Sequence, residues 1–253
     1  MTKPVAIMVH GAFCGGWAFD AFRQPFEAAG YDCLTPDLRG HTPGQSAAGA
    51  SMADYAKDIA ALIEAQATPP VLVGHSLGGL VAQMAAARAP VAALVLLAPS
   101  APWGIAGGSL EEAVSAVSLY ALGPFWLQAI EPAYPLARRY SLDKLDKPGR
   151  KAIFNRMIPE SGRALWETLN WWLDPFMTSQ VVPGRIKAPV LAMVGEHDLI
   201  HPPATVTQTA RRIGGETRVM AGMSHWLLSE PGWETVAGHC LEWLAAKTTA
   251  SAA

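Results

Sequence analysis

A serine flanked by glycines, Gly74-His75-Ser76-Leu77-Gly78, constrains the fold of this chain more than any other stretch. The apolar run Val71-Leu72-Val73 follows Pro69-Pro70, which is typical of a short buried strand. From Leu80 to Arg88 the chain is rich in Ala, Leu and Met, which favours a helix. A Gly-x-Ser-x-Gly turn between a strand and a helix indicates a nucleophile held at a sharp bend, and that nucleophile is Ser76.

Both glycines of this turn have a physical reason. A nucleophile at so sharp a bend sits in strained backbone geometry, and side chains two residues to either side would collide with the strand or the helix. The turn lifts the Ser76 hydroxyl clear of the sheet and points the first N–H groups of the helix at whatever binds there. The alternative is a glycine-rich turn with an incidental serine in a chain of 23 glycines, and the flanking strand and helix argue against it.

The composition indicates a folded chain with a large core. Apolar residues make up 51% and charged residues 16%, which excludes disorder. The formal net charge is −2 and no basic run occurs, so nucleic acid and anionic membrane surfaces are poor partner candidates. Three scattered cysteines, Cys14, Cys33 and Cys240, form neither a metal spacing nor a disulfide framework. We therefore expect a cytoplasmic monomer or homodimer with no metal and no cofactor.

Apolar strands alternate with helices over residues 1–100 and again over 188–246. Continuous apolar strands in this alternation favour a parallel sheet with helices on both faces. Ser51 and Asp54 predict a capped helix through Gln66. We therefore predict an α/β core of about six strands built from these two segments. The expected strands are Val5–Val9, Tyr31–Thr35, Val71–Val73, Val91–Leu97, Pro189–Val194 and Thr217–Met220.

Residues 101–187 break the alternation, and we call this segment the insertion. Helical patterning over Ser109–Leu122, Asp146–Met157 and Glu160–Leu173 predicts a helical cap above Ser76. The small, polar residues 247–253 predict a flexible tail. The run before His10 is too short for a secretory leader, and no apolar run reaches transmembrane length. We therefore expect neither a signal peptide nor a membrane partner.

A serine hydroxyl needs a base and a group that orients the base. Where the nucleophile stands on such a turn, the acid and the histidine follow on loops at the carboxyl ends of later strands. His225 lies on the loop after the last expected strand and is the leading base. Asp198 follows the preceding strand and is the favoured acid, with Glu196 as the competing candidate. His41 and His201 are expected on surface loops, and His10 is expected to structure its own loop.

Two backbone donors are expected to stabilise a developing oxyanion. One is the N–H of Leu77, the residue after the nucleophile, and the other comes from the glycine-rich loop after the first strand. Ala12, directly after Gly11, is the favoured second donor and Phe13 the fallback. The alternative is that this loop is only a strand-to-helix turn.

Four motifs in order give the chain a resemblance to the α/β-hydrolase superfamily. They are His10-Gly11-Ala12-x-x-Gly15-Gly16-Trp17, Gly74-His75-Ser76-Leu77-Gly78-Gly79, Gly195-x-x-Asp198 and His225-x-x-x-x-Glu230-Pro231. The first two are most similar to the small methylesterase and hydroxynitrile lyase group. The resemblance covers residues 4–100 and 188–246 and stops at the insertion. It is specific for the fold and the triad, but only weakly so for the substrate.

The resemblance implies acyl transfer by Ser76, His225 and Asp198 on a small, mainly apolar, uncharged ester or lactone. C–C bond cleavage by the same triad is an alternative, as in a C–C hydrolase or a hydroxynitrile lyase. That lyase group uses a cap lysine near the nucleophile, and the lysines here are expected in exposed, polar surroundings: Lys144, Lys147, Lys151 and Lys187. Perhydrolase activity is a further alternative on the same site. A non-catalytic ligand-binding protein on this fold is the alternative from another class.

Aromatic residues of the insertion and of the catalytic loops are candidates for an apolar substrate pocket. For any single tryptophan of the insertion, packing in the insertion's own core is the competing interpretation. Cys14 is expected to fill space, because no base is placed beside it. The candidate pocket residues are Phe13, Cys14, Trp103, Trp126, Trp171, Trp172 and Trp226.

Overall fold

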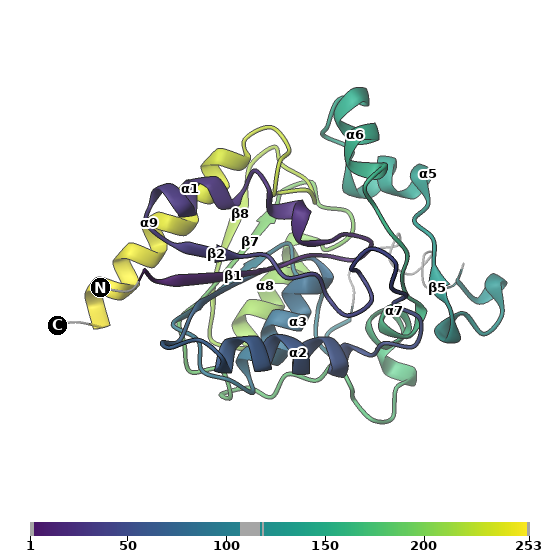
Figure 1. The fold of residues 1–253 in the computed structure, drawn as a ribbon, viewed down its shortest axis with the longest axis horizontal. Helices are drawn as coiled ribbons and strands as arrows, with labels where there is room; N and C mark the ends of the chain where they lie inside the picture. Colours follow the sequence, from purple (N-terminus) through teal and green to yellow (C-terminus); the bar gives the residue numbers. More distant parts are fainter. Residues whose placement is uncertain (1–2, 107–116, 118, 252–253) are drawn as a thin grey trace.

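Six parallel strands form the central sheet of this computed structural model, in which residues 3–106, 117 and 119–251 are described. The strand order is β2-β1-β3-β4-β7-β8, and every neighbouring pair runs parallel (Figure 1). The predicted parallel α/β core of about six strands is therefore confirmed. The strands are β1 (Val5–Val9), β2 (Asp32–Leu34), β3 (Val71–His75), β4 (Ala93–Leu97), β7 (Val190–Gly195) and β8 (Glu216–Met220).

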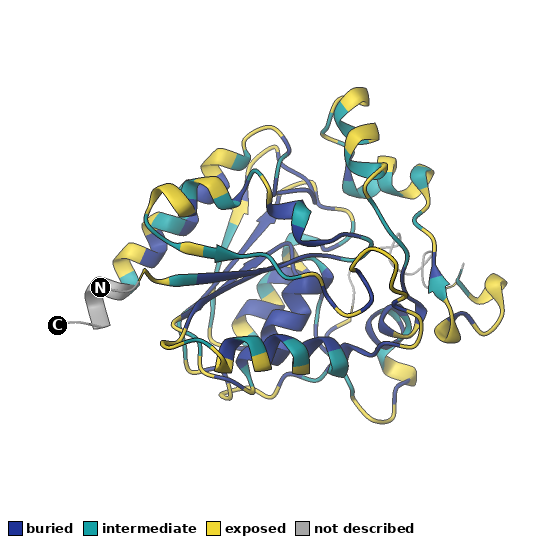
Figure 2. Cartoon of the chain, viewed as in Figure 1, coloured by how far each residue is buried: buried dark blue, intermediate teal, exposed yellow. Residues whose placement is uncertain are grey.

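Helices cover both faces of the sheet (Figure 1). On one face Phe26 of α1 packs with apolar residues of α9 against the sheet, and on the other face apolar residues of α2, α3 and α8 do the same. Figure 2 shows the central strands and the helix α3 buried, while the edge strands and the outer helices are partly exposed. The helices are α1 (Arg23–Ala28), α2 (Met52–Glu64), α3 (Leu77–Ala86), α8 (Pro203–Arg212) and α9 (Trp233–Ser251).

Two helix ends test the sequence-based boundaries. Ser51 caps α2 through a reciprocal pair of hydrogen bonds with Asp54, as its spacing predicts. The helix α9 continues to Ser251, into the segment 247–253 for which the sequence predicts a flexible tail. Lys247 forms an ion pair with Glu216, and its ammonium lies 5.6 Å from the centre of the Trp243 ring, so its side chain is held against the core.

The strand register brings the candidate loops to one edge of the sheet. Gly74 of β3 lies opposite Val9 of β1, and the last residue of β3, His75, lies opposite Leu97 of β4. Gly195 of β7 lies opposite Met220 of β8. Because all these strands are parallel, the loops that follow them share the carboxyl edge, where ligands bind in open α/β sheets.

The insertion lies beyond this edge, at the right of Figure 1. Its helices are mostly short, and it also contains an antiparallel strand pair in which Ala129 lies opposite Ser161. This pair corrects the expectation of helices alone. Residues 109–116 and 118 of the expected helix Ser109–Leu122 lie outside the described residues. The described elements are turns at Tyr120–Leu122, Phe125–Leu127, Ala137–Ser141 and Trp171–Leu173, strands β5 (Ala129–Ile130) and β6 (Glu160–Ser161), and helices α5 (Tyr134–Leu136), α6 (Lys147–Phe154) and α7 (Gly162–Leu169).

Among the described residues, no helix is both long enough and apolar enough to cross a membrane.

Candidate active site

Ser76 stands at the turn between β3 and α3 in a left-handed backbone conformation, with φ 53° and ψ −123°. Such a conformation is strained for a residue with a side chain. The surroundings leave no room for side chains at the flanking glycines. A Cβ atom on Gly74 would lie 2.5 Å from the carbonyl oxygen of Gly78, and one on Gly78 would lie 2.2 Å from that of His10. The glycines therefore permit the close packing that holds Ser76 at the bend.

The predicted base and acid form a hydrogen-bonded chain with Ser76. The hydroxyl of Ser76 donates to Nε2 of His225 at 3.0 Å, and Nδ1 of His225 donates to Oδ2 of Asp198 at 2.9 Å. His225 follows β8 and Asp198 follows β7, so three separate loops at one sheet edge supply the three side chains. The side chains of His225 and Asp198 are almost fully buried.

Asp198 is held in place from both of its oxygens. Its Oδ1 accepts the backbone N–H groups of Ile200 and His201, each at 2.9 Å, while Oδ2 faces His225. Burial alone would raise the pKa of Asp198. The charge of His225 and these hydrogen bonds outweigh burial and lower the pKa below its usual value. Asp198 is therefore suited to remain ionised beside the imidazole.

Glu196 points elsewhere. Its Oε2 accepts the backbone N–H of Gly222 at 2.9 Å at an exposed position, and the ring of His197 lies 3.8 Å from the same oxygen. Glu230, from the fourth motif, accepts the N–H of Ser224 at 2.6 Å and so fixes the loop just before His225.

The two expected oxyanion donors, Ala12 and Leu77, both line the cavity at Ser76. Leu77 is the first residue of α3, where backbone N–H groups have no partner within the helix. The fallback donor Phe13 is engaged elsewhere, since its N–H donates to the buried carboxylate of Glu160 at 3.3 Å. This contact favours Ala12 over Phe13.

Two buried histidines that the sequence did not place at the site lie beside the hydrogen-bonded chain of Ser76, His225 and Asp198. The ring of His201 makes a hydrogen bond of 3.0 Å with the Ser100 hydroxyl and lies 5.3 Å from the ring of His225. The ring of His75 lies 5.1 Å from that of His225, and its Nε2 donates to the carbonyl oxygen of His225. Burial, as the larger cause, and the charge of His225, as the smaller one, lower the pKa of His201 to about 4 and the pKa of His75 to about 3. Both rings are therefore neutral near pH 7.

The remaining histidines of the core lie near the first loop. His10 donates from Nδ1 to the carbonyl oxygen of Gly11 at 2.9 Å and accepts the N–H of Leu38 at Nε2, so it does structure its own loop. His41 is buried and paired with Glu160, which corrects its expected place on the surface, as burial does for His201. Glu160 belongs to the insertion, and no local pattern connects it with His41.

A cavity of about 430 Å³ opens beside Ser76 between the core and the insertion. Its lining is mainly apolar, and among its described residues Glu131 is the only Asp, Glu, Lys or Arg. Three of the candidate pocket residues, Phe13, Cys14 and Trp226, are part of its lining. Burial raises the pKa of the Cys14 thiol, which agrees with a space-filling role.

Four tryptophans predicted for the pocket are placed elsewhere, which corrects that expectation. None of them lines the cavity as the described residues define it. Their rings pack on neighbouring aromatic side chains of the insertion or face solvent. Most of these tryptophans lie on short turns and not on long helices. Trp103 packs on Trp171 at 5.4 Å, Trp171 on Trp172 at 6.0 Å, and Trp126 on Phe125 at 5.5 Å.

The match to a family model for the alpha/beta hydrolase family extends over residues 6–237. The chain belongs to the α/β hydrolase family. This match spans the insertion as well as the motifs at the sheet edge, and the resemblance inferred from those motifs is confirmed.

Known relatives support a hydrolase that acts on ester bonds. A pyrethroid hydrolase of Sphingobium wenxiniae is 38% identical over 81 residues, which is 31% of this chain and only 29% of that enzyme. The mouse sn-1-specific diacylglycerol lipase ABHD11 is 24% identical over 90% of this chain and 77% of its own. The solved structure of methylesterase MES16 from Arabidopsis, 16% identical, superposes with a TM-score of 0.73 over 96% of this chain and 99% of its own, and thus shares the fold.

Proposed function

We propose that this protein is a serine esterase with Ser76 as nucleophile, His225 as base and Asp198 as the acid that orients the base. The observation that carries the proposal is the pair of hydrogen bonds from Ser76 through His225 to Asp198, 3.0 and 2.9 Å long. In the first half-reaction the Ser76 oxygen attacks the ester carbonyl carbon while His225 takes the hydroxyl proton.

The resulting imidazolium is stabilised by the ionised Asp198, whose second oxygen is held by backbone donors. The N–H groups of Ala12 and Leu77 stabilise the tetrahedral oxyanion. His225 then returns its proton to the leaving alkoxide, and an acyl-enzyme on Ser76 results. Water, deprotonated by His225, attacks the acyl carbon and releases the acid in the second half-reaction.

The substrate we propose is a small, mainly apolar and uncharged carboxylic ester or lactone. The cavity is lined mostly by apolar side chains, and the carboxylate of Glu131 disfavours anionic substrates. The insertion supplies much of this lining, including Leu119, Ile130, Leu165 and Leu169, and we propose that it serves as the cap over Ser76. Because one relative is named a pyrethroid hydrolase, pyrethroids are worth including among the trial substrates.

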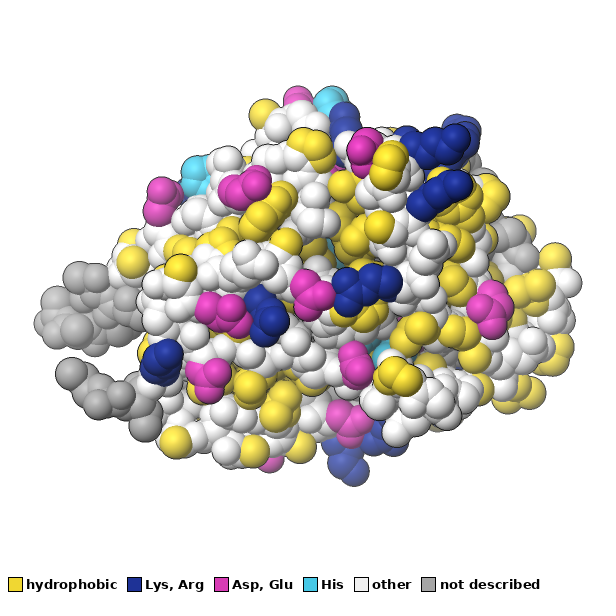
Figure 3. Space-filling model, turned by 45° about the horizontal axis from the view of Figure 1, so that its top comes forward, with side chains coloured by type: hydrophobic (Ala, Val, Ile, Leu, Met, Phe, Trp, Pro, Cys, Tyr) yellow, Lys and Arg dark blue, Asp and Glu magenta, His cyan; other side chains and the backbone are white. Residues whose placement is uncertain are grey.

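The lysines of the insertion argue against a hydroxynitrile lyase. Lys144, Lys147, Lys151 and Lys187 are all exposed, and none lines the cavity. Figure 3 shows Lys and Arg side chains gathered on the outer surface toward the upper right, the side on which Figure 1 places α6. No cap lysine is therefore placed where it could stabilise cyanide beside Ser76.

Hydrolysis of p-nitrophenyl acetate and butyrate tests the proposal, with Ser76→Ala as the control. We expect turnover by the wild type, labelling of Ser76 by a fluorophosphonate probe, and loss of both in Ser76→Ala. A wild type that neither turns over these esters nor takes the label contradicts the esterase proposal. Binding of small apolar esters without turnover supports a ligand-binding protein instead.

A further inference from the structure

Glu160 is a carboxylate buried at the boundary between the insertion and the core. Its side chain is 0% exposed, and four donors surround it. The N–H of Phe13 and Nε2 of His41 donate to Oε2 at 3.3 and 3.1 Å. The hydroxyl of Tyr55 and the N–H of Ser161 donate to Oε1 at 2.8 and 2.7 Å. A carboxylate buried this deeply requires such a set of partners, because an unpaired buried charge is costly.

The charge of Glu160 is retained despite its burial. Burial alone would raise its pKa, but the hydrogen bond to His41, the charge of His41, and the donors Tyr55 and Ser161 lower it below the usual value. Hydrogen bonds to an ionised acceptor are stronger than those between neutral groups. The N–H of Phe13 is thus held by a charged acceptor.

Phe13 adopts a strained conformation that needs such support. Its φ is 63°, in the left-handed region that residues with side chains rarely occupy. Its carbonyl oxygen accepts the N–H of Ile158 at 2.9 Å, so both peptide groups of Phe13 are tied to the segment around Glu160. On the other side of Ala12, the carbonyl oxygen of Gly11 accepts Nδ1 of His10 at 2.9 Å.

Ala12 therefore lies between two anchored peptide groups. His10 holds the peptide group that contains the Ala12 N–H, and Glu160 holds the following one. We propose that Glu160 is a positioning residue that fixes the Ala12 N–H in the direction of the oxyanion, so that the insertion completes the oxyanion hole. This inference rests on the proposed esterase function and goes beyond it, because Glu160 does not line the cavity and its hydrogen bonds go to none of Ser76, His225 and Asp198.

The variant Glu160→Gln isolates this role. All four partners are donors, and a glutamine amide offers one accepting oxygen and one NH₂ group that cannot accept. Whichever way the amide turns, two donors face the NH₂ group, while the volume of the side chain is unchanged. Tyr55→Phe is a milder second variant, because it removes a single donor to Oε1 and keeps the aromatic ring.

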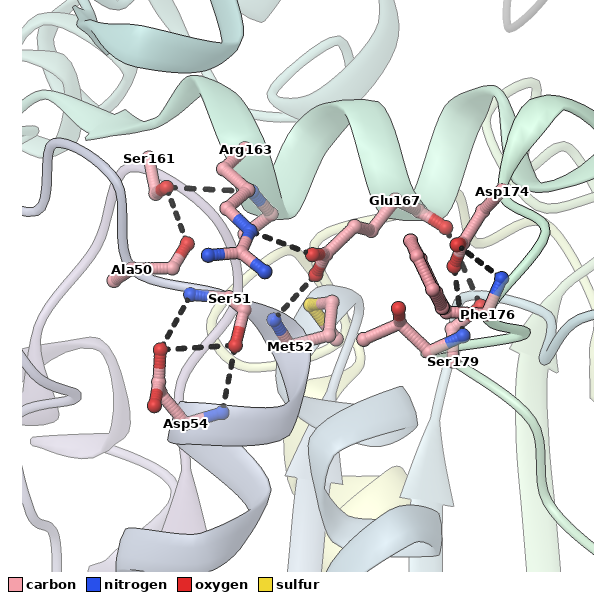
Figure 4. A network of polar contacts seen from close by, with 12 residues as sticks. Ala50, Ser51, Met52, Asp54, Ser161, Arg163, Glu167, Asp174, Phe176 and Ser179 are labelled. Atoms are coloured by element: carbon pink, nitrogen blue, oxygen red, sulfur yellow. Dashed lines mark hydrogen bonds and ion pairs between the residues drawn. The ribbon is translucent and has the colours of Figure 1, made fainter.

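Glu167 provides a matched control within the same insertion (Figure 4). It is also a buried carboxylate that joins the insertion to the core, since it accepts the N–H of Met52 at 2.8 Å and Nε of Arg163 at 2.9 Å. Among the described residues the hydrogen bonds of its side chain go to Met52 and Arg163 and not to the loop of Ala12 and Phe13, and it does not line the cavity. Glu167→Gln therefore reports the cost of disturbing a buried contact between insertion and core without disturbing the oxyanion loop.

The experiment compares these variants with the wild type on p-nitrophenyl butyrate and on a pair of inhibitors. A trifluoromethyl ketone forms a hemiketal oxyanion when the Ser76 oxygen bonds to its carbonyl carbon and the proton passes to His225, whereas the matching methyl ketone binds mainly as a neutral carbonyl. We expect Glu160→Gln to lower kcat by about tenfold to a hundredfold with little change in KM, as misdirection of one oxyanion donor would. Affinity for the trifluoromethyl ketone falls in parallel, and affinity for the methyl ketone stays.

Tyr55→Phe is expected to shift the same quantities by a few fold, and Glu167→Gln to leave kcat and the inhibitor preference unchanged. The proposal is overturned if folded Glu160→Gln keeps the wild-type values, if both ketones lose affinity equally, or if Glu167→Gln loses as much kcat. If Glu160→Gln does not fold, an unaltered kcat and inhibitor preference in Tyr55→Phe overturns it. A wild type with no more turnover than Ser76→Ala rejects the esterase function itself, and the two failures are thereby distinguished.

Discussion

The backbone N–H of His201 donates to Oδ1 of Asp198 at 2.9 Å, which leaves only Oδ2 to face His225. The N–H of Ile200 reinforces the same orientation. The carboxylate of Asp198 therefore cannot rotate freely, and an asparagine side chain at this position would be oriented by the same two N–H groups.

Asp198→Asn is expected to lower kcat by about ten-thousandfold. The asparagine oxygen must accept the N–H groups of Ile200 and His201, which turns its NH₂ group toward Nδ1 of His225. Nδ1 must then accept, so the proton moves to Nε2, which can no longer take a proton from Ser76. Steady-state kinetics with p-nitrophenyl butyrate measure the loss.

Glu196→Gln is the control for this substitution. Its side chain bonds to Gly222 at the surface, away from the triad, so kcat is expected to stay within a few fold of the wild type. The reverse pattern, with activity lost in Glu196→Gln and kept in Asp198→Asn, would reassign the acid.

Acid should destabilise the folded protein partly through His201. Its pKa is lowered from 6.5 to about 4 by burial and by the charge of His225. Between these two values the unfolded chain binds a proton that the folded chain does not, so stability is lost as the pH falls through this window. The contribution of one such group is about 1.4 kcal/mol per pH unit.

The slope of the unfolding free energy against pH tests this expectation. We expect His201→Gln to have a shallower slope than the wild type by about one proton between pH 6 and 4.5, as measured by urea denaturation. An identical slope in the two proteins would mean that His201 takes up its proton in both states.

Substitution by alanine at two helical glycines should change the stability of the folded protein in opposite directions. In Gly78→Ala the new Cβ would lie 2.2 Å from the carbonyl oxygen of His10, so the first turn of α3 must move and both stability and kcat should fall. At Gly238 in α9 a Cβ meets nothing within 4 Å, and Gly238→Ala is expected to stabilise by about 0.5–1 kcal/mol. Thermal unfolding of both variants decides, and a loss of stability in Gly238→Ala would argue against the α9 packing.

The acyl-chain preference should follow the cavity and not the tryptophans. Ala133 lines the cavity, and Ala133→Leu fills part of it, so kcat/KM for p-nitrophenyl octanoate relative to acetate should fall by about tenfold. The side chain of Trp172 is largely exposed, and Trp172→Ala should leave this ratio unchanged. If this ratio changes in Trp172→Ala and not in Ala133→Leu, Trp172 and not Ala133 contacts the acyl chain.

Chain order and local pattern predict the parts of the site that belong to the sheet. Ser76 and Asp198 follow strands with clear apolar character, whereas the strand before His225 is Glu-Thr-Arg-Val-Met and is recognised mainly by its place in the chain order. Parallel strands bring the loops that follow them to one edge, whatever their distance along the chain. The glycines around Ser76 add a local signal that is independent of tertiary contacts. The fold and the proximity of these three side chains could therefore be predicted without coordinates.

The contribution of the insertion could not be predicted in the same way. Trp126 and Trp171 lie on short turns, where no helical period indicates which side of the segment faces the cavity. Glu160 meets His41 and Phe13 only through tertiary contacts across more than a hundred residues. From the local sequence alone, a glutamate at position 160 would be expected at the surface, although its side chain is buried.

The contact between the insertion and the strained loop at Phe13 limits how this architecture can be recombined. A chimera that exchanges residues 101–187 for the corresponding segment of a relative would remove both Glu160 and Ile158, the two residues that hold the peptide groups of Phe13. The chimera would then have a new substrate pocket, but the loop at Phe13, close to Ser76, would lack both of these hydrogen bonds. Grafts that keep residues 158–161 from this chain avoid that loss and divide pocket shape from catalytic support at a defined point in the sequence.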